Sequence, residues 1–222
     1  MGMVEMFGWK SKTTEFARRS VEVSGAYDGA LALQTHGLMA GTRVASNLGW
    51  RAIEALAVGD QVLTFDNGMQ EIVEIRRKVF FLDAPETDQA VWPVTIPVGA
   101  LGNREELTLL ADQGVLIESD AAVDRHGDPF AVVPALSLVG LRGITREAPA
   151  QQIELIAVYF ATDEVVYAEG GALVHCPSRT TPLDAMMHGV VPSYDVMGAA
   201  DAAHLAQAIM VEDQMSASGA FA

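Results

Sequence analysis

Hydrophobic and polar residues alternate with a period of two through most of the central part of the chain. The alternation comes in short runs, and Gly, Pro, Asn and Asp residues separate most of them. A period of two puts every second side chain on one face, which is typical of strands with one buried face. Evenly spaced short strands of this kind predict an all-β domain. The expected strands cover residues 42–46, 60–65, 70–75, 94–98, 107–110, 115–118, 130–133, 153–160 and 164–168.

Short polar segments between these runs predict turns. Asn67-Gly68 joins two runs, and both central residues of a type I′ turn need a positive φ, so we expect a hairpin with this turn. Residues 53–56 are expected to form one helical turn, and the acidic residues of 120–128 a solvated turn. The basic run 76–78 is interpreted as a charged strand end that discourages edge pairing.

The two flanks differ from the centre in composition. Residues 1–36 form an N-terminal arm whose first 20 residues have a small positive excess. Residues 37–176 carry the dense hydrophobic pattern and are expected to be the folded domain. Residues 177–222 form an acidic tail, in which no Lys or Arg follows Arg179. Within the tail, the spacing of Leu205 and Ile209 predicts a short helix over 201–210.

Charge and hydropathy exclude several classes of partner. The chain has 14 Lys and Arg against 29 Asp and Glu, a net charge of −15, and half of its residues are hydrophobic. The apolar content suffices for a packed core, and the negative charge repels nucleic-acid phosphates and anionic lipid surfaces. No apolar run is long enough for a membrane helix, so we expect no membrane insertion. We expect a protein partner instead.

Metal and cofactor sites have no support in the sequence. The single cysteine, Cys176, excludes an internal disulfide and a thiolate zinc cluster. The histidines lack the spacing of a metal motif, so no metal and no cofactor is expected. Because no N-terminal apolar segment resembles a secretory signal, we expect a cytoplasmic location or export without a cleaved N-terminal signal.

One block of sequence resembles a known family. Ala-Gly-Thr-Arg-Val at 40–44, Gly49-Trp50 and Val-Gly-Asp-Gln-Val-Leu at 58–63 stand in the order found at the start of the Hint domain. This domain is shared by hedgehog autoprocessing modules and inteins, and the likeness is to its bacterial form. The resemblance continues at 98–102, 133–135 and 164–170 and covers about 37–176. It implies a pseudo-twofold β fold, to which we add the short C-terminal helix.

The family resemblance implies self-cleavage, which needs a nucleophile and a proton donor. A cysteine four residues before the glycine of Gly-Thr attacks the preceding carbonyl, and a His of a Thr/Ser-x-x-His element protonates the departing nitrogen. Here the corresponding positions hold Gly37, Leu110 and Gln113. Ala157 and Asp163 stand where bacterial relatives often have histidines in the last strands. The sequence therefore predicts a catalytically inactive Hint-like domain that acts as a binding or structural module, in which Gly37, Gln113 and Asp163 converge.

Two other readings remain open. Thr35 or Cys176 could replace the missing nucleophile and support residual autoprocessing, although a loop residue and a small buried apolar residue are their plainer interpretations. His175-Cys176 also lacks the Asn that cyclises at intein C-termini. Alternatively, the chain is a subunit of an exported or particle-associated assembly, because its acidic tail, which has no Lys or Arg after Arg179 and ends in Ser-Gly-Ala-Phe-Ala, resembles type I export signals in composition.

Overall fold

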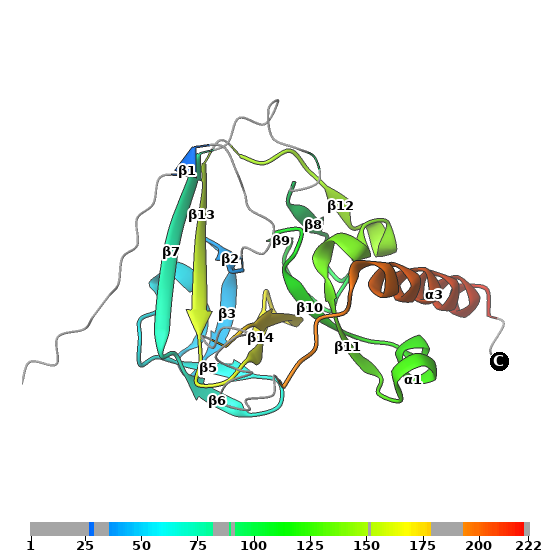
Figure 1. Ribbon diagram of the computed structural model, residues 1–222, viewed down its shortest axis with the longest axis horizontal. Coiled ribbons are helices and arrows are strands. Elements are labelled where there is room, and N and C mark those ends of the chain that lie inside the picture. The colour runs from blue at the N-terminus through cyan, green and yellow to red at the C-terminus, as the bar shows by residue number, and fades with distance from the viewer. Residues whose placement is uncertain are drawn as a thin grey trace, which may run out of the picture.

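Three β-sheets surround one main hydrophobic core in this protein (Figure 1). The computed structural model describes residues 27–28, 36–81, 89, 92–150, 152–178 and 193–219. The expected all-β class is confirmed, and so is a helix near the C-terminus.

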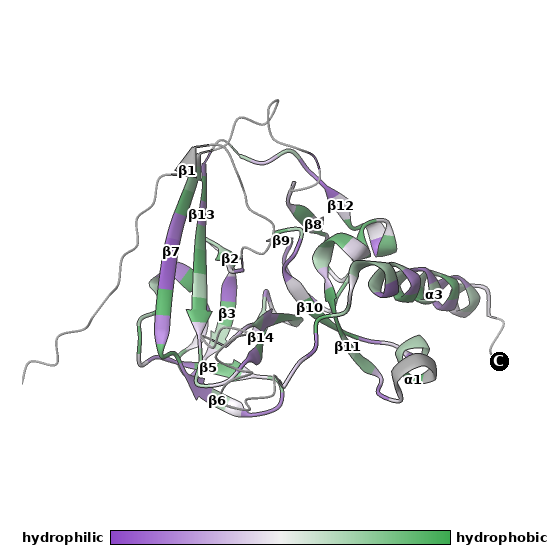
Figure 2. Ribbon diagram, viewed as in Figure 1, coloured by the Kyte–Doolittle hydropathy of each residue, from purple (hydrophilic) through white to green (hydrophobic). Residues whose placement is uncertain are grey.

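The first sheet has the order β1-β7-β13-β2. Its strands are β1 (Tyr27–Asp28), β2 (Leu38–Met39), β7 (Glu74–Phe81) and β13 (Gln152–Tyr159). The two long strands, β7 and β13, pair antiparallel along their whole length, from Gln152↔Phe81 to Tyr159↔Glu74. Figure 2 shows that β13 is more hydrophobic than its neighbour β7, in keeping with its mostly buried side chains.

The second sheet is the largest and has the order β11-β10-β15-β14-β3-β5-β6, with β4 paired to β3. Its strands are β3 (Arg43–Ser46), β4 (Gly49–Ala52), β5 (Gln61–Thr64), β6 (Gly68–Glu71), β10 (Gly114–Glu118), β11 (Phe130–Pro134), β14 (Glu164–Ala168) and β15 (Ala172–Cys176).

The third sheet is small and follows the period-two pattern closely. It contains β12 (Thr145–Arg146), β8 (Val94–Ile96) and β9 (Leu107–Leu109), in that order. The apolar residues Val94, Ile96, Leu107 and Leu109 belong to the main core. Thr95 and Thr108 are cross-strand partners and point to the opposite face.

Two α-helices and three short 3-10 turns complete the described part of the chain. Their bounds are α1 (Asp120–His126), α3 (Ala199–Ala217), η1 (Ile53–Ala55), η3 (Ala135–Leu138) and η4 (Leu141–Gly143). Ala202, Leu205 and Ile209 of α3 enter the main core, so the face expected from their spacing is the buried one. None of the helices in the described residues is long and apolar enough to cross a bilayer.

Two local expectations are wrong. Residues 120–126 form a helix instead of a turn, because the Ser119 hydroxyl accepts a hydrogen bond from the Ala121 N–H and Gly127 ends the helix with a φ of 74°. The basic run 76–78 lies inside β7 and does not end a strand. It is held there because Arg76 pairs with Glu74 at 2.6 Å and stacks over the Tyr159 ring.

The hairpin at Asn67-Gly68 is confirmed, but its turn type is wrong. Thr64 pairs with Gly68, which leaves a three-residue connection in place of a two-residue one. Gly68 has a φ of 66°, whereas Asn67 does not have a positive φ. The Asn67 amide instead donates to both carboxylate oxygens of Glu164, at 3.1 and 3.0 Å, and this tertiary contact sets the loop.

Candidate functional site

The side chain of Gln113 joins the beginning of the folded domain to its end. Its Oε1 accepts a hydrogen bond from the Gly37 N–H at 3.0 Å. Its Nε2 donates to the carbonyl oxygens of His175, at 2.6 Å, and Gly114, at 3.3 Å. Gln113 is only 1% exposed. Because both ends of the carboxamide have partners of opposite kind, its orientation is fixed and the expected approach of Gln113 to Gly37 is observed.

Gly37 lies in a space that has no room for a side chain. Its φ is 143°, a conformation that residues with a Cβ rarely adopt. A Cβ built on it would lie 3.0 Å from the Ile156 carbonyl oxygen and 3.0 Å from Leu155 Cγ. A larger residue at this position therefore requires β13 to shift.

A small cavity marks the place where the ends of the domain meet. It is lined by His36, Gly37, Leu38, Gln113, Ile156, Ala157, Val158, Tyr159, Val174, His175, Cys176 and Pro177. Its volume of ≈ 10 Å³ is at the lower limit for one water molecule, roughly 10–15 Å³. Ala157 thus belongs to the lining of this centre, whose volume is too small for a substrate.

Asp163 reaches this centre through His175. The His175 ring is 5% exposed, and its Nε2 lies 3.8 Å from Asp163 Oδ2, longer than a hydrogen bond. Neither ring nitrogen has a hydrogen-bond partner. Burial lowers the pKa of His175, while Asp163 opposes this effect and His36 adds to it. The ring is consequently neutral at physiological pH.

The Asp163 carboxylate is hydrogen-bonded to the segment that precedes α3. Its two carboxylate oxygens accept hydrogen bonds from the Ser193 and Tyr194 N–H groups, each at 2.9 Å. The Tyr194 ring packs edge-on against His175, with centroids 5.7 Å apart, and the Tyr194 hydroxyl donates to Asp66. Asp163 therefore fastens the segment that leads to α3 beside the cavity.

The other predicted site residues do not form a reactive set with Gly37. Leu110 lies in a separate apolar cluster with Phe80, Ile153 and Leu155. Cys176 lines the cavity, but burial raises the pKa of its thiol to about 12. Thr35 lies outside the described residues.

Sequence reasoning missed the two histidines of this centre: it considered His175 only as the residue before Cys176 at an end without the cyclising Asn and as one of several histidines without metal spacing, and it gave His36 no role beyond a loop residue. Both line the cavity, and burial lowers the pKa of His36 as well. The available signal was positional: His36 precedes Gly37 and His175 precedes Cys176 at the two ends of the expected domain. Gly114 makes room for the second histidine, because a Cβ there would lie 3.0 Å from His175 Cβ.

Comparisons with known proteins identify similar domains. The family model described as the Hint domain matches residues 36–174. The solution structure of a bacterial intein-like domain from Clostridium thermocellum is 15% identical, with a TM-score of 0.46, and the match covers 64% of this chain and 99% of that one. The crystal structure of the gp41-1 intein is 16% identical with a TM-score of 0.40, and the match covers 64% of this chain and 99% of that one. The MchDnaB-1 intein is 16% identical with a TM-score of 0.39, and the match covers 62% of this chain and 98% of that one. None of the curated proteins compared with the chain matches it. Through residues 36–174, which span more than half of its length, the chain belongs to the Hint domain family.

Proposed function

We propose that this Hint domain does not cleave its own chain and serves as a structural or binding module that keeps its upstream segment attached. The observation that carries the proposal is the hydrogen bond from the Gly37 N–H to Gln113 Oε1. It occupies the junction where an active domain would need a nucleophile and a proton donor.

The absence of a nucleophile at position 37 supports the proposal. Glycine has no side chain to attack the carbonyl of His36. The contacts of the virtual Cβ with Ile156 and Leu155 also indicate that the surrounding strand has closed over the place of a nucleophilic side chain. Close-packed interiors do not leave such a space empty, so we expect the neighbouring strand to fill the space once the side chain at position 37 is absent.

The chemistry of Gln113 supports it as well. The oxygen of the carboxamide faces the N–H of residue 37, so this group accepts a hydrogen bond and does not donate a proton to the peptide nitrogen. A carboxamide does not exchange a proton near neutral pH. Rotation by 180° would place two N–H groups against each other at Gly37 and two oxygens against each other at His175.

Residual autoprocessing through Cys176 is the second candidate, because this thiol lines the same cavity as Gly37. A thiol with a pKa of about 12 is deprotonated in only about one molecule in 10⁵ at pH 7. His175 is not hydrogen-bonded to this thiol as a base would be, since neither of its ring nitrogens has a hydrogen-bond partner. The inactive reading is therefore the better supported one.

The test is the intact mass of the full chain, incubated at neutral pH with protease inhibitors and with or without hydroxylamine. We expect one species of 23.6 kDa throughout. Cleavage between His36 and Gly37, with a hydroxamate on His36, would contradict the proposal because only an ester or thioester intermediate gives this adduct. If the adduct also disappears in C176S, the Cys176 mechanism is established instead.

A further inference from the structure

A hollow lined by aromatic rings lies over β10 and β11 of the second sheet, and it shares no residue with the cavity at Gly37. Its volume is ≈ 390 Å³, within the range of roughly 300–1,000 Å³ typical of ligand sites. Its lining contains no Lys, Arg or His. We refer to it as the aromatic hollow, and its lining includes three rings and three carboxylates, those of Phe65, Phe130, Tyr194, Asp66, Asp128 and Asp195.

The period-two pattern of β11 places one of these rings. Ala131 and Val133 enter the main core, so Phe130 points to the opposite face of the sheet. On that face Phe65 and Tyr194 pack against the same small apolar cluster as Phe130. The ring centroids of Phe65 and Phe130 lie 5.1 Å apart, with an angle of 65° between the ring planes. The two rings therefore form adjoining walls of a corner instead of a parallel stack.

Hydrogen bonds hold two of the three ring residues in place. The Phe130 N–H donates to Asp128 Oδ1 at 2.9 Å. Tyr194 is held at both ends, because Asp163 accepts its N–H and Asp66 accepts its hydroxyl. The walls of the hollow are thus fixed before a ligand arrives, which lowers the entropy cost of binding.

The three carboxylates give the aromatic hollow a negative rim. Asp66, Asp128 and Asp195 are exposed, and none of them forms an ion pair with another described residue. The described part of the chain also has no group of three His, Cys, Asp or Glu side chains that could hold a metal ion. The aspartates are therefore spread around the rings and do not meet at one point. This arrangement fits a bulky organic cation better than a metal ion, which needs several oxygens at about 2.0–2.6 Å.

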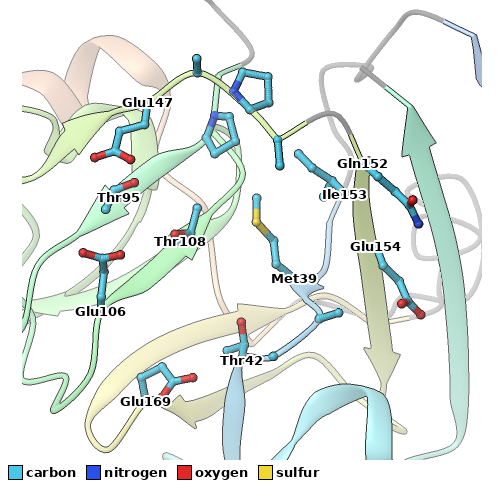
Figure 3. Close-up of a pocket in the computed structure, with 16 residues that line it drawn as sticks. Met39, Thr42, Thr95, Glu106, Thr108, Glu147, Gln152, Ile153, Glu154 and Glu169 are labelled. Carbon is cyan, nitrogen blue, oxygen red and sulfur yellow. The ribbon is translucent and has the colours of Figure 1, made fainter. Parts of the chain in front are cut away.

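Aromatic rings distinguish this hollow from one that is merely acidic. A larger hollow of ≈ 690 Å³ lies between the first and third sheets, and Figure 3 shows Glu106 and Glu147 along one of its walls. No aromatic residue lines it. The face of an aromatic ring attracts a cation at short range, in addition to the attraction of nearby carboxylates. Of the two hollows, the aromatic one offers both interactions.

We propose that the aromatic hollow binds a quaternary ammonium compound, whose cationic head lies against Phe65, Phe130 and Tyr194. A methylated ammonium fits because its methyl groups can contact the ring faces, whereas a primary ammonium is strongly hydrated. The carboxylates repel an anion, and the rings favour a cation over an uncharged compound of the same shape. The inference rests on the binding part of the proposed function, for which it supplies the class of ligand.

The test is a titration of the ¹⁵N-labelled full chain with choline, followed through the amide shifts in NMR spectra. The neutral alcohol in which carbon replaces the choline nitrogen serves as the uncharged probe. We expect choline to shift the amides of Phe65, Phe130 and Tyr194 in a saturable way and the alcohol to leave them nearly unchanged. F130L should raise the dissociation constant of choline about 5- to 30-fold, the effect of losing one cation–π contact. D195N, at an exposed position, should raise it about two- to fivefold.

Two matched controls separate the rings from general charge. W50L removes an exposed ring outside the aromatic hollow, and E106Q/E147Q removes two charges from the larger hollow, so neither should change the dissociation constant. A thermal melt of each variant verifies folding. The absence of a saturable shift, equal shifts with choline and the alcohol, or equal losses in D195N and E106Q/E147Q would each overturn the proposal. The intact mass of the same samples keeps the two proposals apart: an uncut chain that does not bind choline refutes only the ligand class, whereas a cut at position 37 refutes the proposed function.

Discussion

Replacing Gln113 with leucine tests the link between the two ends of the domain. Leucine has a similar volume but no polar group, so Q113L removes the two shorter hydrogen bonds, to the Gly37 N–H and the His175 carbonyl, together with the longer one to the Gly114 carbonyl, and leaves the packing nearly intact. Each buried polar group that loses its partner costs about 1–3 kcal/mol, which gives about 2–6 kcal/mol for the two. We expect about 3 kcal/mol, because a carbonyl oxygen tolerates the loss better than an N–H.

The assay is urea unfolding of the full chain, followed by the linear dependence of the free energy of unfolding on urea. With a slope of about 2 kcal/mol/M, the expected loss lowers the midpoint by about 1.5 M. Amide exchange at Gly37 should accelerate in parallel, since its N–H loses its acceptor. The matched control is Q61L, at an exposed strand position. If the urea midpoint of Q113L differs from that of the wild type by no more than the midpoint of Q61L does, the hydrogen bonds of Gln113 do not stabilise the fold and the reasoning is refuted.

Three further predictions concern the buried residues His175, Cys176 and Leu205. Because burial lowers the pKa of His175, its charged form is disfavoured in the folded state. The free energy of unfolding is therefore not reduced by His175 above about pH 6.5, and it falls as the pH drops below this value because the unfolded state then binds the proton more readily. In urea midpoints measured from about pH 5 to 8, H175Q should show a weaker pH dependence than the wild type. Parallel curves for the two proteins would contradict this role of His175. The Cys176 thiol, with its pKa raised to about 12, should react with a disulfide reagent at pH 8 only after unfolding, and fast labelling of the native chain would argue against its burial. L205A should lower the free energy of unfolding by about 2–4 kcal/mol because Leu205 of α3 is 1% exposed, whereas V211A, at an exposed position of the same helix, should change it little; equal effects would show that α3 does not share the core.

Local patterns predicted most strands because the alternation of apolar and polar residues within a strand indicates which of its faces is buried. The alternation at 94–98 and 107–110 corresponds to β8 and β9, whose apolar residues enter the core. The same reasoning identified the buried face of α3, although the helix extends beyond both expected ends. These features depend on neighbours in sequence, so a window of sequence contains them.

Local patterns failed where a distant residue decides the outcome. The basic run 76–78 lies within β7 because β13 supplies a paired strand and a tyrosine ring across it. The helix α1 was missed for a local reason instead. It is too short for a periodic signal, but its caps Ser119 and Gly127 are visible in the sequence and could have predicted it.

The sequence likewise predicted only part of the candidate site. The resemblance to the Hint family aligned Gly37 and Gln113 with one centre, and their hydrogen bond confirms that they meet. It did not indicate that the carboxamide oxygen faces the N–H, or that His175 lies between Asp163 and the cavity. Those relations depend on side-chain packing among strands far apart in sequence.

The sequence by itself determined the alternating strands, the charge of the chain and the residue types at the family positions, since these are properties of single residues and near neighbours. Only the tertiary structure decided what those residues touch. Gly171 illustrates the difference: the sequence indicates a turn there, but a Cβ would lie 2.1 Å from the Gly102 carbonyl oxygen, so two distant loops require the glycine. The closed centre at Gly37 likewise comes from long-range packing, because its walls are brought together from separate sheets and cannot be read from any one segment.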